Sequence, residues 1–209
     1  MTAKLPCFPH NTSKLCSLLE LALSAPPSHP EHQQLMTPMS EPASAPECFI
    51  FLDINGVVRT CATQEIWDAH CTAALRHVID APAQTVGIVL TSSWRQDATR
   101  LELARTLLHK HALPPLIGCT PELSKEHAMR GSEILEWLRV CGSSDCAWIA
   151  IDDGPLLVKH EHNSVQCRLL EQRTLTPVSS TGLTMSLAEE AVRLLVSQCR
   201  REPIDCGDV

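Results

Sequence analysis

The sequence predicts an open α/β fold with a mostly parallel, Rossmann-like sheet and helices on both of its faces. Three short apolar runs, at 48–53, 86–91 and 146–152, each end in a polar residue. Runs of this length fit strands that are buried on both faces of a parallel sheet. Segments with helical periodicity lie between them, and such alternation of strand and helix is typical of an α/β layer architecture.

Four helices follow from apolar positions three or four residues apart. The apolar stripe of the first lies between residues 66 and 78, that of the second between 101 and 111, and that of the third between 134 and 138. The fourth is predicted to open at Ser186, because Glu189 follows at the spacing of a capping box. Leu116 and Ile117 form a short apolar segment between the second and third helices.

The chain divides into a tail, one domain and a short end segment. Residues 1–46 hold eight of the fifteen prolines and none of the eight glycines, so we expect a disordered tail. Within it, residues 13–25 fit one amphipathic helix. We expect the domain over residues 47–201 and a C-terminal tail over 202–209.

Composition excludes several classes of protein. The net charge is −7 and no run of Lys or Arg occurs, so autonomous binding of nucleic acid is not expected. No apolar stretch approaches the roughly 18 residues that span a bilayer, so we expect no membrane partner. The eleven cysteines form no CxxC pair, and the N-terminus has no pattern of a signal peptide. These features favour thiols in a reducing intracellular compartment, the cytoplasm.

Polar side chains collect where the predicted strands end, at 53–56, 91–95 and 152–154. In an open α/β sheet, ligands bind outside the carboxyl ends of the strands. Adjacent carboxylates such as Asp152 and Asp153 repel each other unless a cation neutralises them. Oxygen ligands of this kind suit Mg²⁺ together with a substrate phosphate. Capping of the following turns is the structural alternative for each strand taken alone.

Four motifs in this order resemble those of the haloacid-dehalogenase (HAD) superfamily of phosphohydrolases. They are the strand ending in Asp53-Ile54-Asn55-Gly56, the pair Thr91-Ser92, the helix start at Arg130, and the pair Asp152-Asp153. The segments 92–95, 130–134 and 181–184 narrow the resemblance to a group of small HAD domains found alone and within nucleic-acid-repair proteins. The resemblance covers about residues 48–200.

The resemblance implies a role for each of these residues. Asp53 would be the nucleophile and would form an aspartyl-phosphate intermediate. Mg²⁺ would be the cofactor, held by Asp53, the backbone carbonyl of Asn55, and Asp152 or Asp153. Phosphate would be bound by Thr91 or Ser92 and by Arg130. Arg95 is either a second phosphate contact or the partner of a helix-start acid such as Asp97, and Trp94 is expected to pack in the core.

Asn55 departs from the pattern of the family's phosphatases, in which this position is an Asp that serves as general acid and base. An Asn cannot exchange a proton in that role, and such assistance is typically worth ~10²–10⁴-fold. Three outcomes stay open: a slow phosphatase, a phosphotransferase that keeps its aspartyl-phosphate longer, and a relative that only binds. The main prediction is a slow Mg²⁺-dependent phosphohydrolase. The alternative is a catalytically impaired scaffold that binds phosphate or a protein partner.

The gaps between the motifs are too short for a separate cap domain. An uncapped site is open, and in this superfamily that goes with macromolecular substrates or with a partner that acts as a lid. The expected partner is therefore a phosphorylated substrate whose identity the sequence leaves open, including a phosphoprotein or a substrate delivered by a partner.

Overall fold

A computed structural model of the 209-residue chain describes residues 45–62, 66–123, 129–141, 146–156 and 165–199. The chain forms two units, Met1–Ala43 and Ser44–Val209, and the fold described below belongs to the second. Nearly all of the predicted N-terminal tail, the helix predicted at 13–25 and the predicted C-terminal tail lie outside the described residues, so these boundaries stay predictions. Within the described part, no helix has the length and apolar character needed to cross a membrane.

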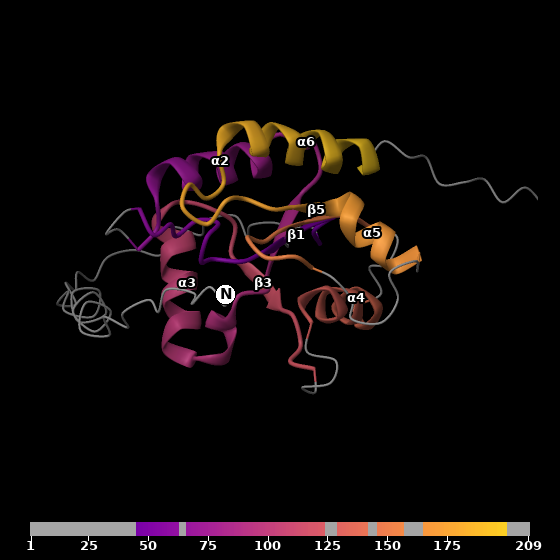
Figure 1. Cartoon of the computed structure of the whole chain (residues 1–209), viewed down its shortest axis with the longest axis horizontal. Helices are drawn as coiled ribbons and strands as arrows, with labels where there is room; N and C mark the ends of the chain where they lie inside the picture. The colour runs from indigo at the N-terminus through magenta and orange to yellow at the C-terminus, as the bar shows by residue number, and fades with distance from the viewer. Residues whose placement is uncertain (1–44, 63–65, 124–128, 142–145, 157–164, 200–209) are drawn as a thin grey trace, which may run out of the picture. The chain divides into compact units, whose positions relative to one another are not determined.

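The described strands form one parallel sheet in the order β3-β2-β1-β4-β5 (Figure 1). Their bounds are Cys48–Leu52 for β1, Val86–Leu90 for β2, Leu116–Cys119 for β3, Ala147–Ile151 for β4 and Thr174–Leu175 for β5. The three predicted strands are confirmed to within one residue at each end. The structure adds β3 and β5 as edge strands, and their shortness explains the weak sequence signal. The predicted fold class is confirmed.

The α-helices in the described ranges are α2 (Ala69–Asp80), α3 (Ala98–Lys110), α4 (Arg130–Val140), α5 (Val165–Arg173) and α6 (Met185–Cys199), with a 3₁₀ turn η1 at Ser93–Gln96. The α5 helix was not predicted. The predicted opening of the last helix at Ser186 was wrong, and the predicted apolar stripe at 66–78 begins before its helix. Trp67 precedes α2, whose N-cap is Asp68, and the side chain of Asp68 accepts from the His70 and Cys71 amides. The hydroxyl of Thr184 accepts from the Leu187 amide at 3.3 Å, so Thr184 and not Ser186 caps α6.

Side chains alternate between two helical layers along each strand. On one face α2 packs beside α6, as seen along the top of Figure 1. On the other face Phe51, Val89 and Trp148 pack against α4 and α5. Phe51 and Trp148 meet edge to face with ring centroids 5.7 Å apart. The sheet is therefore buried on both faces, as continuous apolar strands require.

The order of the strands determines where the site lies. The chain runs outward from β1 through β2 to β3 and then returns to form β4 on the other side of β1. Ligands of open α/β sheets bind where the direction of winding reverses, outside the carboxyl ends of the strands. Here that point lies between β1 and β4, whose ends carry Asp53 and Asp152. Within the described ranges no separate domain interrupts this edge, in agreement with the prediction of an uncapped fold.

Candidate active site

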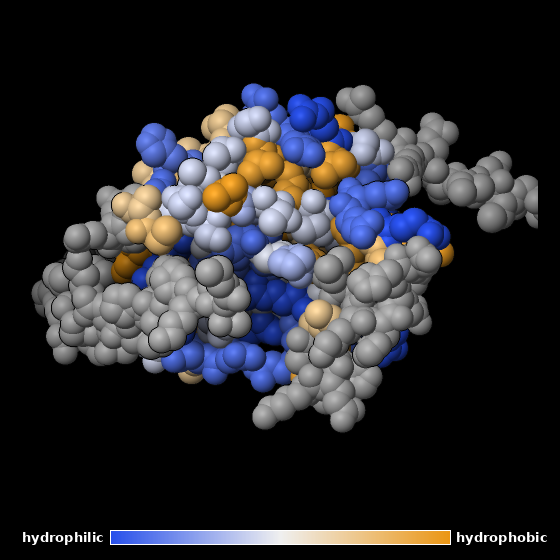
Figure 2. Space-filling view, viewed as in Figure 1, coloured by the Kyte–Doolittle hydropathy of each residue, from blue (hydrophilic) through white to orange (hydrophobic). Residues whose placement is uncertain are grey.

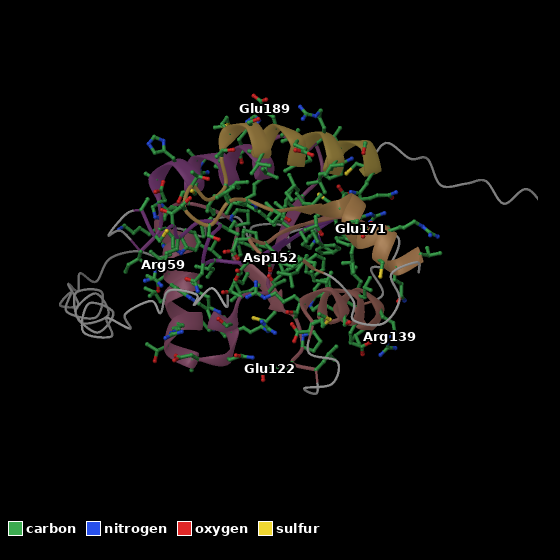
Figure 3. All side chains as sticks on the ribbon, viewed as in Figure 1. Arg59, Glu122, Arg139, Asp152, Glu171 and Glu189 are labelled. Carbon is green, nitrogen blue, oxygen red and sulfur yellow. The ribbon has the colours of Figure 1, made fainter. Side chains whose placement is uncertain are left out.

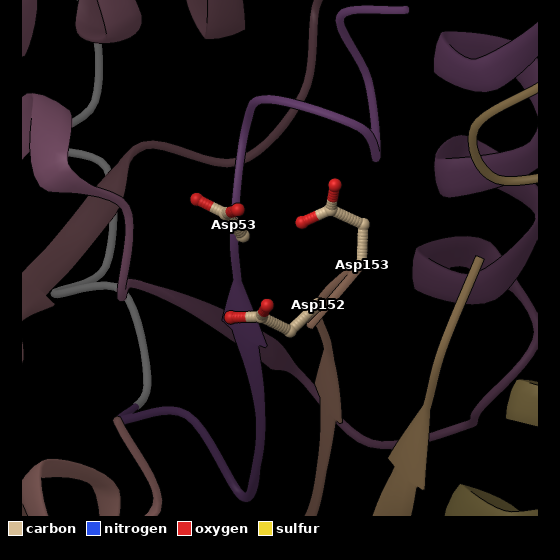
Figure 4. A group of neighbouring side chains, drawn as sticks. All are labelled: Asp53, Asp152 and Asp153. Atoms are coloured by element: carbon tan, nitrogen blue, oxygen red, sulfur yellow. The ribbon is translucent and has the colours of Figure 1, made fainter. Parts of the chain in front are cut away.

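Three carboxylates meet at the point of reversal (Figure 4). Leu52 and Ile151 pair across β1 and β4, so Asp53 and Asp152 follow them side by side. One carboxylate oxygen from each of Asp53, Asp152 and Asp153 lies within 4.8 Å of the others. Asp53 and Asp152 are both buried, with 2% of each residue exposed. Buried acids at this separation need positive charge beside them.

Arg130, the first residue of α4, supplies part of that charge. Its Nη1 lies 2.8 Å from Asp53 Oδ2 and also donates to Asp152 Oδ2. Burial lowers the pKa of the Arg130 guanidinium, but Asp53 and Asp152 outweigh that effect and raise it above its ordinary value. One guanidinium therefore faces three carboxylates, and the cluster keeps an excess of negative charge.

The environment of Asp152 favours its protonated form. Burial and the neighbouring Asp53 raise the pKa of Asp152 to about 6, although Arg130 and the Gly154 amide act in the opposite direction. The Gly154 amide donates to Asp152 Oδ1 at 2.9 Å. A cation in this cluster would relieve the repulsion that raises the pKa.

Asp153 is held from two sides. The hydroxyl of Ser179 donates to its Oδ2 at 2.7 Å. On the other side Gly56 has a φ of +74°, and a Cβ built there would lie 2.1 Å from the same oxygen. Gly56 is thus required both by its left-handed backbone and by the approach of Asp153.

Asp53 Oδ1 is buried and has no hydrogen-bond partner among the residues that the structure describes. Buried polar atoms are nearly always paired, so an unpartnered carboxylate oxygen indicates a missing ligand. The hydroxyls of Thr91, Ser92 and Thr120 are likewise buried without partners. Thr91 follows β2 and Thr120 follows β3, and their amides donate to Leu52 and Leu90, which continues the ladder of the sheet past the ends of the strands.

Arg95 is wholly occupied by the protein itself. Its Nη1 donates to the carbonyls of Thr91 and Ser92, its Nε donates to the Thr120 carbonyl at 3.1 Å, and its Nη2 lies 2.7 Å from Glu133 Oε2. The predicted alternative, an ion pair with Asp97, was wrong about the acid, because the side chain of Asp97 caps α3 instead. Trp94 is 2% exposed, which confirms that it packs in the core.

Asn55 is exposed at the rim, where its Oδ1 accepts from Arg59 Nη1 at 3.4 Å. The structure thus brings Asp53, Asp152 and Asp153 together, with Arg130 paired to the first two and with Thr91 and Ser92 on the adjacent strand end. The predicted catalytic, metal and phosphate roles of these residues stay predictions.

Sequence reasoning missed Thr120 and Ser179, and it noted Glu133 only within the segment 130–134, without its contact with Arg95. Thr120 follows β3, a short edge strand with a weak sequence signal, so its position beside Thr91 was not predicted. Glu133 and Ser179 act through contacts more than 25 residues away along the sequence, with Arg95 and Asp153. Thr120 carried a signal as a hydroxyl residue directly after the apolar 116–119 segment, and Glu133 belonged to a segment that supports the family resemblance.

The site opens to solvent through a depression of about 300 Å³ lined by Met129, Arg130, Asp152, Asp153, Gly154 and Pro155. Hydrophilic residues gather in the middle of the face shown in Figure 2, which is the part of the view where Figure 3 labels Asp152. An open, polar depression suits a charged group better than an apolar ligand.

The described strands form a five-stranded parallel sheet, with acids at its point of reversal and a basic residue, Arg130, at the start of α4. This combination defines a HAD-like α/β domain. The sequence comparison narrows this class. Residues 49–188 match the family described as the HAD domain in Swiss Army Knife RNA repair proteins, and the chain belongs to that family. Comparisons with curated proteins and with solved structures found no significant match.

Proposed function

We propose that the protein is a Mg²⁺-dependent phosphohydrolase that works through an aspartyl-phosphate on Asp53. The observation that carries this proposal is Asp53 Oδ1, a buried carboxylate oxygen without a partner, next to two further carboxylates and Arg130. Arg130 occupies only the other oxygen, Oδ2, so Oδ1 is free to form a new bond.

The donor set fits a hard divalent cation. The three clustered groups offer oxygen atoms only, and Mg²⁺ prefers carboxylates, waters and substrate phosphate over nitrogen or sulfur ligands. Asp53, Asp152 and Asp153 would hold the ion, with the Asn55 carbonyl as the further ligand that the family resemblance implies. When bound, Mg²⁺ would neutralise negative charge on the phosphoryl group.

The chain's own residues carry the rest of the reaction. Asp53 attacks phosphorus, a P–O bond to Asp53 forms, and the bond to the leaving oxygen breaks. Arg130 and the unpartnered hydroxyl of Thr91 or Ser92 bind phosphoryl oxygens. Water then attacks phosphorus, the bond to Asp53 breaks, and inorganic phosphate leaves with the Asp53 carboxylate restored.

Asn55 limits the rate of both steps. It neither gives a proton to the leaving oxygen nor takes one from water, so the leaving group takes its proton from solvent. Loss of such assistance corresponds to ~10²–10⁴-fold in rate. This same residue favours the second candidate function, a scaffold that binds phosphate or a protein partner without turnover.

The substrate is a phosphate ester that reaches an open site. The family's description refers to RNA repair proteins, which supports a phosphate at the end of an RNA strand as the substrate. An uncapped site suits such a terminus, because the rest of a large substrate stays outside the depression.

The test is hydrolysis of an activated aryl phosphate with and without Mg²⁺ by wild type, Asn55→Asp and Asp53→Asn. We expect slow Mg²⁺-dependent activity in wild type, faster activity in Asn55→Asp, and none in Asp53→Asn. Activity in Asn55→Asp alone would favour the binding scaffold. Equal activity in wild type and Asp53→Asn would contradict the proposed nucleophile.

A further inference from the structure

A cationic side chain stands beside Asn55 at the rim of the site. Arg59 Nη1 donates to Asn55 Oδ1 at 3.4 Å. The backbone fixes this neighbour, because the Arg59 amide donates to the Ile54 carbonyl at 2.9 Å and the Gly56 amide donates to the Arg59 carbonyl at 2.8 Å. The tight turn that follows Asp53 therefore holds Arg59 beside Asn55.

The charge of Arg59 is not neutralised by the part of the chain that the structure describes. Its side-chain partner there is Oδ1 of Asn55, and no described carboxylate forms an ion pair with it. Partial burial, and after it the like-charged Arg100, lower the pKa of Arg59. Arg59 and Arg100 follow the ends of the paired strands β1 and β2, and no described carboxylate bridges them, so an anion at this edge would meet two guanidinium groups.

Arg100 belongs to the same edge of the sheet. It lies in the first turn of α3, which begins directly after the turn that follows the end of β2. Its nearest recorded acid is Asp97, at 3.9 Å, and Oδ1 of Asp97 already accepts from the amides of Thr99 and Arg100. In the view of Figure 3, Arg59 and α3 fall on the same side of Asp152.

From this arrangement we infer that Arg59, together with Arg100, binds a second phosphate group that the leaving group of the substrate carries. The inference rests on the proposed function, which assigns the Asn55 side of the site to the leaving group. It narrows the substrate class to phosphate esters with a further phosphate nearby, such as a nucleoside bisphosphate or the end of a polynucleotide. Guanidinium groups suit this role because they bind phosphate through several N–H donors in a fixed geometry.

The local charge explains how an acidic chain can hold such a substrate. The net charge of −7 belongs to the whole sequence, whereas the rim on the Asn55 side carries Arg59 and Arg100. A substrate with a single phosphate would use only the central site. A substrate with two phosphates would gain further contacts at the rim. One charge-assisted hydrogen bond there corresponds to ~10-fold or more in affinity.

The test is a calorimetric titration with Mg²⁺ of wild type, Arg59→Gln, Arg100→Gln and Arg193→Gln. The probes are adenosine 3′,5′-bisphosphate and adenosine 5′-monophosphate. We expect wild type to bind the bisphosphate ~10-fold tighter, and Arg59→Gln to remove most of this preference without changing affinity for the monophosphate. Arg193, an exposed arginine of α6, is the matched control, and its variant should keep the full preference.

Two results would overturn the inference: no preference for the bisphosphate in wild type, or an equal loss for both nucleotides in Arg59→Gln. Thermal melting of each variant checks that it is folded. Because binding is measured without turnover, the outcome is independent of the hydrolysis assay. A bisphosphate preference without hydrolysis would support the anion site and contradict the phosphohydrolase. Hydrolysis without a bisphosphate preference would support the phosphohydrolase and contradict the anion site.

Discussion

Arg95 and Glu133 form a buried ion pair that joins the end of β2 to α4. The two side chains are 6% and 7% exposed, and Arg95 Nη2 lies 2.7 Å from Glu133 Oε2. Glu133 follows Arg130 by three residues in the same helix, while Arg95 also holds the carbonyls of Thr91, Ser92 and Thr120. The pair therefore fixes the helix end that carries Arg130 relative to the strand ends that carry the hydroxyls.

Replacing Arg95 by Met should lower the free energy of unfolding by about 3–5 kcal/mol, because Glu133 would be left as an unpaired buried charge. Urea denaturation measures this. The matched control is Arg139→Met, which breaks the exposed pair with Glu136 and should leave the urea midpoint unchanged. A loss below about 1 kcal/mol in Arg95→Met would mean that Arg95 does not hold the strand ends together.

Gly56→Ala should destabilise the fold by about 1–3 kcal/mol and abolish stabilisation by Mg²⁺, since the new Cβ requires a strained φ and displaces the Asp153 carboxylate. Thermal melting with and without Mg²⁺ measures both effects. Gly154→Ala is the control from the same site, because its Cβ would meet its nearest atom at an ordinary 3.4 Å. Retention of the Mg²⁺ effect in Gly56→Ala would argue against Asp153 as a ligand.

The stability of the metal-free protein should respond to the titration of Asp152. Its pKa is about 6 in the folded protein and about 3.9 in an unfolded chain, so the folded state binds this proton more tightly. The contribution is fully present below about pH 4 and is lost as pH rises through about 6, on the order of 3 kcal/mol. Urea denaturation from pH 4 to pH 7 measures it.

The control for this pH dependence is Asp152→Asn, which has no proton to lose there. The difference in unfolding free energy between wild type and this variant isolates the contribution of Asp152 from that of all other acids. Wild type should lose stability relative to the variant as pH rises. A difference that is flat across this range would show that Asp152 titrates normally.

Much of the fold and the centre of the site could be predicted from the sequence. Long apolar runs such as 146–152 carry a strong strand signal, and a polar residue after each run marks the carboxyl edge. Asp53 and Asp152 could be paired in advance because the ends of parallel strands meet at one edge. The acidic cluster follows from that rule, whereas Arg130 was expected there only from the family resemblance, and its contact with Asp53 and Asp152 comes from the structure.

The remaining features depend on tertiary contacts that leave no local pattern. The partner of Arg95 was sought in its own helix start, whereas Glu133 is 38 residues away along the sequence. Ser179 reaches Asp153 from the segment after β5, a strand of two residues. The cap of α6 is Thr184, two residues before Ser186, because the hydroxyl of Thr184 accepts from the Leu187 amide.

The most direct test of the central claim is mass spectrometry of the protein after brief incubation with an aryl phosphate and Mg²⁺, followed by acid quenching and peptide mapping. Because Asn55 cannot activate the hydrolytic water, we predict that a phosphoryl group accumulates on Asp53 in wild type. It should be scarcer in Asn55→Asp and absent without Mg²⁺. Two results would contradict Asp53 as the nucleophile. One is Mg²⁺-dependent release of phosphate without any modification of Asp53, and the other is a phosphoryl group on another residue.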